Sequence, residues 1–181
     1  MKRLTVILLI VLAACAPWTR VGGLYKSESN NYSADLPEGW MVWNRGENLL
    51  ITRDGALLQN IQIIRVNIEK PLNYTKKKLS RGMLPQEIAE TILDDLQSSQ
   101  HFQDLNLIEN SPAKIAGFDG FKIVYTYKTK DNLKMKSIYC GFMLGDWLYG
   151  INYNAAQRYY FDKDVPAFQG VLESFRIIKA G

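Results

Sequence analysis

Residues 113–155 read AKIAGFDGFKIVYTYKTKDNLKMKSIYCGFMLGDWLYGINYNA, and this segment decides the fold class of the chain. It holds three runs rich in β-branched and aromatic residues, separated by the turn-forming pairs Asp131-Asn132 and Gly145-Asp146. Connections this short join antiparallel strands, because a parallel crossover needs a dozen or more residues. Together with the preceding stretch LNLIEN (105–110), the segment predicts an antiparallel meander.

Further strand signals lie in the N-terminal part of the chain. YSADLPEGW (32–40) predicts a strand, then a turn at Pro-Glu-Gly, and then a new strand that begins at the aromatic residue Trp40. NLLITRDG (48–55) and ALLQNIQIIRVNI (56–68) predict a hairpin around Asp54-Gly55. Residues 69–84 show neither helical nor strand periodicity and are long for an internal connection. They are either a functional loop or simply a mobile one.

Two amphipathic helices complete the pattern. Pro85 opens the first, which is expected to end near Ser99 and has apolar residues at helical spacing: Ile88, Ala89, Ile92 and Leu96. Asp164 is the expected N-cap of the second. Its apolar stripe is Val165, Phe168, Leu172 and Phe175. The sequence therefore predicts a single α+β domain, a mostly antiparallel β-sheet flanked by helices.

Four stretches carry a resemblance to known proteins: YSADLPEGW, AGFDGFKIVYTY (116–127), GDWLYGINYNA (145–155) and FDKDVPAFQGVLESFRI (161–177). They resemble the superfamily of PsbP-like photosystem proteins, DcrB-like envelope lipoproteins and a nuclear Ran-binding protein. This resemblance implies an α/β/α sandwich, and members that mostly bind proteins without catalysing a reaction. The four stretches are turns and strand ends, so they indicate fold rather than function.

The N-terminus reads as a secretory signal, residues 1–14. Lys2 and Arg3 precede a mostly apolar stretch from Leu4 to Ala14, which is too short to span a bilayer. LAAC (12–15) resembles the lipobox of bacterial lipoproteins. That family implies cleavage between Ala14 and Cys15, a diacylglycerol on the Cys15 thiol and acylation of the new amine. The alternative is an ordinary signal peptide with a chance cysteine.

The residues after Cys15 predict how the protein is held. Ala16 and Pro17 stand where an aspartate often marks inner-membrane retention, so the lipoprotein resemblance implies the outer membrane, with the domain facing the periplasm. Residues 15–23 are expected to be the lipidated end and a short flexible tether of about 15 Å. The domain is then expected to occupy residues 24–181.

Charge gives no argument for nucleic acid as a partner. The 22 basic and 18 acidic residues give a formal charge of +4. Loss of residues 1–14 lowers it to +2 and leaves 167 residues, enough for one domain with a core. With Cys15 acylated, Cys140 has no disulfide partner. It lies on a strand with Ile138 and Phe142 on the same face, which favours a small buried hydrophobe over a reactive thiol.

No catalytic pattern stands out. The one histidine, His101, follows the first helix and fits a helix C-terminus better than a Ser-His-Asp triad with Asp104. A zinc site would need more His, Cys or acidic ligands than the chain brings together. The acidic pair Asp94-Asp95 is typical of a solvated surface. We expect no cofactor, no metal and no enzymatic activity.

Two candidate contact surfaces remain. Trp147, Tyr149 and Tyr153 alternate along one strand and are either core filling or an aromatic groove for an apolar peptide. The run KKKLSRG (76–82) places Lys76, Lys77, Lys78 and Arg81 in the long connection. It is either a solvated loop or a contact for anionic lipid or an acidic partner.

These observations predict a non-enzymatic, lipid-anchored binding or accessory protein of the bacterial envelope that acts through protein contacts. A small periplasmic hydrolase or a carrier of an apolar ligand is the alternative. An enzyme should show a pocket with converging polar groups, whereas a binding protein should show an exposed apolar groove with few titratable residues inside.

Overall fold

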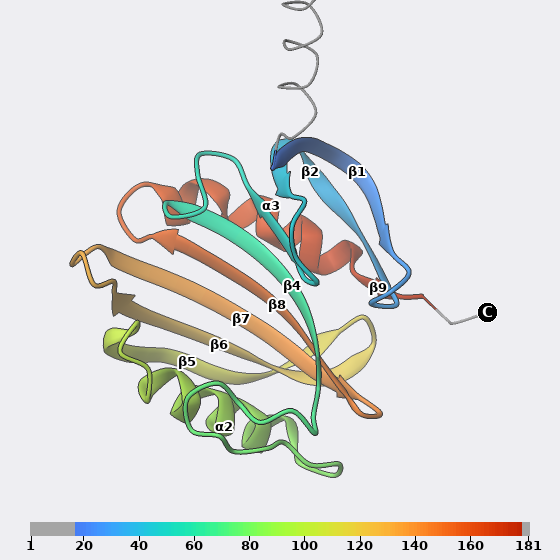
Figure 1. Cartoon of the computed structure of the whole chain (residues 1–181), viewed down its shortest axis with the longest axis vertical. Coiled ribbons are helices and arrows are strands. Elements are labelled where there is room, and N and C mark those ends of the chain that lie inside the picture. Colours follow the sequence, from blue (N-terminus) through green and yellow to red (C-terminus); the bar gives the residue numbers. More distant parts are fainter. Residues whose placement is uncertain (1–16, 179–181) are drawn as a thin grey trace, which may run out of the picture.

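A computed structural model describes residues 17–178. Two helices, α2 and α3, and a series of strands make up this part of the chain (Figure 1). In chain order the elements are β1 (Trp18–Ser27), β2 (Tyr32–Trp43), β3 (Leu49–Thr52), β4 (Gln59–Asn67), α2 (Pro85–Gln97), β5 (Gln103–Ile115), β6 (Phe118–Lys128), β7 (Lys134–Leu144), β8 (Trp147–Ala156), α3 (Tyr160–Ser174) and β9 (Arg176–Ile177).

The strands form one sheet in which every pair is antiparallel. Their order is β1-β2-β3-β4-β8-β7-β6-β5, and the short β9 pairs with β2. The meander expected from residues 105–155 is present as β5 to β8, and β3 and β4 form the expected hairpin. The predicted α+β fold is confirmed.

One strand boundary within the meander differs from the expectation. The run 113–130 contains a turn at Ala116-Gly117, and the strands on either side pair Ile115 with Phe118. Both turn residues have positive φ, 51° for Ala116 and 88° for Gly117. Two such residues close a tight hairpin, so β5 continues from LNLIEN through Ile115. Alanine at the first turn position hid this signal, because glycine, asparagine or aspartate is the usual residue there.

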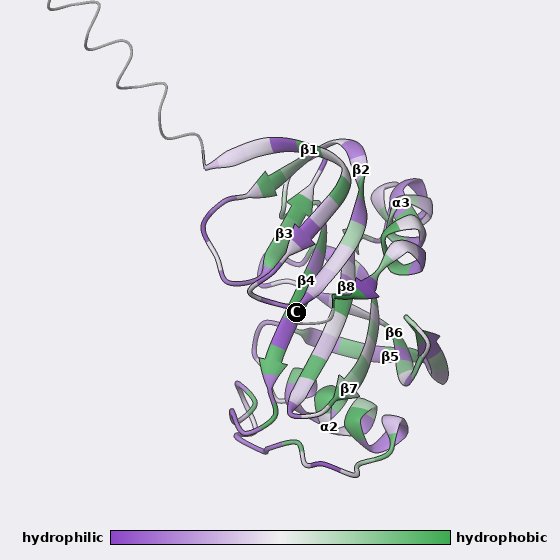
Figure 2. Cartoon of the chain, turned by 90° about the vertical axis from the view of Figure 1, so that its right-hand side faces the viewer, coloured by the Kyte–Doolittle hydropathy of each residue, from purple (hydrophilic) through white to green (hydrophobic). Residues whose placement is uncertain are grey.

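The helices pack on opposite faces of the sheet. Residues of β7 alternate between two cores, with Ile138, Cys140 and Phe142 in the core beneath α3 and Tyr139 in the core beneath α2. α3 contacts β2 and β8, while α2 contacts β5 and β6. The two views in Figures 1 and 2 place α2 at the end of the molecule opposite the start of β1.

The expected tether is wrong for residues 18–23. They form the first half of β1 and pair with β2, from Trp18 opposite Trp43 to Gly23 opposite Leu36. A bulge between Val21 and Gly23 interrupts the register, and Gly23 adopts a φ of 74°. The sequence of this stretch shows no strand periodicity, since a bulge interrupts the alternation. The stretch is nevertheless a strand because it pairs with β2.

The expected start of the last helix is also wrong. α3 begins at Tyr160, with Tyr159 as its N-cap residue, so Asp164 lies inside the helix. The Asp164 side chain is 1% exposed and its carboxylate pairs with the Arg53 guanidinium at 2.5 Å. An aspartate that resembled a cap in the sequence therefore makes a tertiary ion pair instead.

Candidate functional site

The three aromatic residues expected to form a groove belong to the core beneath α3. Tyr149 and Tyr153 are 2% and 0% exposed. Tyr149 stacks on Phe142, and the Tyr153 hydroxyl donates to two backbone carbonyls at the start of α3. Trp147 is half-buried under the Arg65 guanidinium, which lies 3.7 Å from its ring centre. The groove prediction is therefore wrong for these residues, because α3 covers the face from which they project.

The basic run is exposed, but carboxylates face three of its four cations. The ion pairs are Lys77 with Asp94, Lys78 with Glu69, and Arg81 with Asp146. The Arg81 pair is bidentate. The ammonium of Lys76 donates to a backbone carbonyl of the same loop. An anionic surface would have to compete with these carboxylates, so the run presents less positive charge than its composition indicates.

The connection that carries this run is fastened to α2. It has no helix or strand between residues 69 and 84, as expected. Leu79 is buried against α2, and one carboxylate oxygen of Asp95 accepts hydrogen bonds from the backbone N–H groups of Tyr74 and Thr75 and from the Thr75 hydroxyl. Asp95 is itself 7% exposed. The connection is a fixed strap along the helix.

The remaining residues singled out in the sequence do not converge. Cys140 is 1% exposed, and its burial raises the pKa of the thiol to about 12. His101 is exposed beyond the end of α2. Within residues 17–178 no group of three or more His, Cys, Asp or Glu side chains is arranged to hold a metal ion. In the same range neither helix is long and apolar enough to cross a membrane. Ala14 and Cys15 lie outside the described residues.

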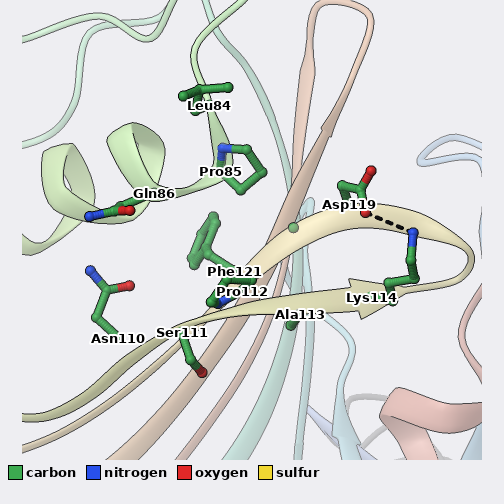
Figure 3. Close-up of a pocket in the computed structure, with 11 residues that line it drawn as sticks. Leu84, Pro85, Gln86, Asn110, Ser111, Pro112, Ala113, Lys114, Asp119 and Phe121 are labelled. Atoms are coloured by element: carbon green, nitrogen blue, oxygen red, sulfur yellow. Dashed lines mark hydrogen bonds and ion pairs between the residues drawn. The ribbon is translucent and has the colours of Figure 1, made fainter.

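A groove that the sequence did not reveal lies between α2 and the β5–β6 hairpin (Figure 3). Its volume is about 620 Å³. The first turn of α2 forms one wall and the strands form the other, with Phe121 between them. The lining residues are Leu84, Pro85, Gln86, Asn110, Ser111, Pro112, Ala113, Lys114, Asp119, Gly120 and Phe121.

Local sequence explains the wall on the helix side. Pro85 occupies the first helical position, where its missing N–H costs nothing, and it keeps the preceding Leu84 extended, with φ −68° and ψ 152°. The Leu84 N–H donates to the Glu87 carboxylate at 2.7 Å. This cap leaves the Leu84 side chain 64% exposed at the mouth of the groove.

The lining of the groove suits apolar contact more than acid–base chemistry. Its two charged residues, Lys114 and Asp119, form an ion pair with each other at 2.7 Å, and both side chains are mostly exposed. The other lining groups are apolar side chains, neutral amides and a hydroxyl. The groove therefore has the exposed apolar lining with few titratable residues that is expected of a binding protein, and it lacks the converging polar groups that are expected of an enzyme pocket.

The strand beside the groove is the last of the sheet. β5 pairs with β6 on one side, and no strand in residues 17–178 pairs with its other side. Bulges interrupt its register around Asp104 and Ile108, and Pro112 removes one N–H donor. Leu107 and Ile108 are 43% and 53% exposed. Residues 110–114 of β5 also line the groove, so the groove lies along this edge strand.

Sequence reasoning missed this groove because its walls come from distant positions. Pro85 indicated the start of a helix, but nothing in the sequence indicated that this start lies beside Pro112. The packing of α2 on β5 and β6 brings them together.

Comparison with known proteins agrees with this architecture. Residues 23–177 match the PsbP family profile. The fold is similar to that of cyanobacterial PsbP (CyanoP) from Synechocystis sp. PCC 6803, with a TM-score of 0.60 and 17% identity over 91% of this chain and 94% of that one. It is also similar to the Saccharomyces cerevisiae Ran-binding protein Mog1p, with a TM-score of 0.59 and 8% identity over 88% and 97% of the two chains.

A protein from Bacteroides thetaiotaomicron shares the fold at a TM-score of 0.58 and 14% identity, over 88% of this chain and 50% of that one. No curated protein matches the sequence. At these identities the solved structures establish the fold, whereas the family profile spans most of the chain. The chain therefore belongs to the PsbP family.

Proposed function

We propose that this protein is a lipid-anchored binding or accessory protein of the bacterial cell envelope, without catalytic activity of its own. It contacts a partner protein through the groove beside α2. The observation that carries this proposal is the groove itself, an apolar cleft lined in part by β5, whose outer edge pairs with no strand in residues 17–178. Extended peptides use these two features together, because a strand edge supplies backbone hydrogen bonds and a cleft accepts side chains.

The N-terminal sequence supports the envelope location. LAAC (12–15) supplies a thiol at the position where a lipoprotein is acylated, and Ala16-Pro17 favours the outer membrane, with the domain facing the periplasm. Several acyl chains on one residue hold a protein firmly, whereas a single chain binds only marginally. A protein partner is supported by the family fold, since one protein that shares it is named as a Ran-binding protein.

Site-specific crosslinking in the native envelope tests the groove. A photoreactive amino acid at Gln86, in the groove wall, should give discrete protein adducts, and the same amino acid at the exposed Gln169 of α3 should not. Leu84→Asp should abolish the adducts from position 86, because it puts a carboxylate at an apolar mouth. Leu57→Asp is the matched control, since Leu57 is 86% exposed in the β3–β4 turn. Adducts that persist in Leu84→Asp would contradict a protein contact at this groove.

A carrier of an apolar ligand is the second candidate, because the groove volume lies within the range of about 300–1,000 Å³ that small-molecule sites occupy. Native mass spectrometry of the protein purified from its envelope separates the two candidates. A bound small mass that Asn110→Trp displaces, in the absence of protein adducts, would favour the carrier, because the Asn110 side chain points toward Gln86 across the groove (Figure 3).

A further inference from the structure

The polypeptide is held in the sheet from the first described residue. The Pro17 carbonyl accepts a hydrogen bond from the Asn44 N–H at 3.0 Å, and Trp18 lies opposite Trp43 in the β1–β2 register. The Thr19 hydroxyl donates to the Asn44 side chain at 3.1 Å. The start of β1 and the end of β2 therefore form one fixed end of the molecule.

Covalent geometry limits how far this end can lie from Cys15. Two peptide links separate Cys15 from Pro17, and each spans 3.8 Å between Cα atoms, so the two Cα atoms are at most about 7.6 Å apart. A flexible tether of eight residues would instead average about 15 Å and reach much farther. The headgroup region of one leaflet is about 5–7 Å thick. A lipid on Cys15 would thus bring this end to the headgroups.

The side chains at this end suit a lipid interface. Trp18 and Trp43 pack together with their ring centres 5.0 Å apart, and both are half-buried. Arg20 and Arg45 are exposed, and within residues 17–178 neither has an ion-pair partner. Tryptophan is enriched at membrane interfaces, and arginine is attracted to anionic headgroups. Glu47 is the acidic residue of the neighbouring turn.

We infer that this end lies against the lipid surface, with the Trp18–Trp43 pair at the level of the headgroups. The inference rests on the proposed anchor at Cys15, and the partner is a phospholipid surface that contains anionic lipid. The pair limits the tilt of the domain, which the acyl chains alone leave free.

This placement has a consequence for the groove. α2 lies at the end of the molecule opposite the start of β1, as Figures 1 and 2 both show. The groove is lined by the first turn of α2, so in this placement it lies away from the end of the molecule that contacts the lipid. The anchor and the groove are thereby separated, and a partner reaches the groove without displacing the domain from the lipid.

The test uses the full-length protein, processed in its own membrane and reconstituted in vesicles of phosphatidylcholine and phosphatidylglycerol. A fluorophore is attached to Gly46→Cys, at an exposed turn position with room for a side chain, or to Gln86→Cys, and a phospholipid with a nitroxide headgroup quenches it. The native Cys140 is 1% exposed and escapes labelling, and acylated Cys15 has no free thiol. Mass spectrometry of the same sample reports whether Cys15 is acylated.

We expect quenching at position 46 to exceed that at position 86 several-fold. The double variant Trp18→Ser/Trp43→Ser should reduce the difference in quenching between the two labelled positions. The control Trp147→Ser, which also removes a half-buried indole, should leave that difference unchanged. Thermal unfolding of each variant shows that the domain remains folded.

Equal quenching at the two positions, in protein with acylated Cys15, would overturn the inference and leave the anchor intact. An unchanged difference in the Trp18/Trp43 variant would overturn the role of the pair. An unmodified Cys15 would overturn the anchor and, with it, this inference.

Discussion

Asp164 is the residue whose environment departs most from its sequence pattern. It lies within α3 with its side chain 1% exposed, and only one of its carboxylate oxygens has a partner, the Arg53 guanidinium. Burial raises the pKa of Asp164 above its ordinary value, and the attraction of Arg53 opposes that rise without cancelling it. The folded protein therefore holds this proton more tightly than the unfolded chain does.

Stability should depend on pH through this group. Because the folded-state pKa of Asp164 is raised, the stability that its protonated form contributes is lost as the pH rises through that pKa. Relative to Asp164→Asn, which cannot titrate, the free energy of unfolding of the wild type should increase as the pH falls from neutral toward 3.8. Urea titrations of both proteins at matched pH measure this difference. A constant difference would show that the attraction of Arg53 cancels the effect of burial on the pKa, and a difference that grows toward neutral pH would show that it outweighs burial.

Cys15 decides whether the protein is anchored. Cys15→Ser should abolish acylation and leave unprocessed precursor or released protein, because a hydroxyl is a far weaker nucleophile than a thiolate for this transfer. Cell fractionation and mass spectrometry of the N-terminal peptide measure the result. Cys140→Ala is the control, because it removes the buried thiol and leaves the N-terminus unchanged. An unmodified Cys15 in the mature wild type would refute the anchor.

Among the elements, the strap of residues 69–84 depends on one helix residue. The Asp95 carboxylate accepts three hydrogen bonds from the strap, so Asp95→Ala leaves two backbone donors without their partner. We expect a loss of about 3 kcal/mol in the free energy of unfolding. Asp94→Ala, next to it, removes only the exposed pair with Lys77 and should cost about 0–1 kcal/mol.

Hydrogen exchange separates a local effect from a global one. Amides of residues 69–84 should lose protection in Asp95→Ala and keep it in Asp94→Ala. Equal protection in both variants would show that the burial of Leu79, rather than Asp95, fastens the strap.

For the molecule as a whole, β1 is a structural strand at the edge of the sheet. A protein that begins at Leu24 lacks the residues that pair with 40–43, and it would expose the edge of β2 beside the buried Trp40. It should unfold at a lower temperature than a protein that begins at Ala16, and it should aggregate, because an unpaired strand edge recruits other chains. Circular dichroism melts and light scattering test this. If both proteins melt at the same temperature and both remain monomeric, residues 18–23 are a tether and not a structural strand.

Local signals were sufficient for the elements whose information is local. The turn pairs at 131–132 and 145–146, the alternation along β7 and the apolar spacing of α2 each lie within a few residues, and each was predicted. The motif LAAC likewise needs only its own neighbourhood, and the anchor that it predicts lies outside the described residues.

What required the tertiary structure is everything that depends on a partner distant in the chain. β1 exists because β2 pairs with it, Asp164 is buried because Arg53 reaches it, and Tyr149 and Tyr153 are core because α3 covers them. The groove exists because α2 packs beside the β5–β6 hairpin. A single sequence carries no record of these distances, since burial and pairing arise from contacts between segments and not from the pattern within one.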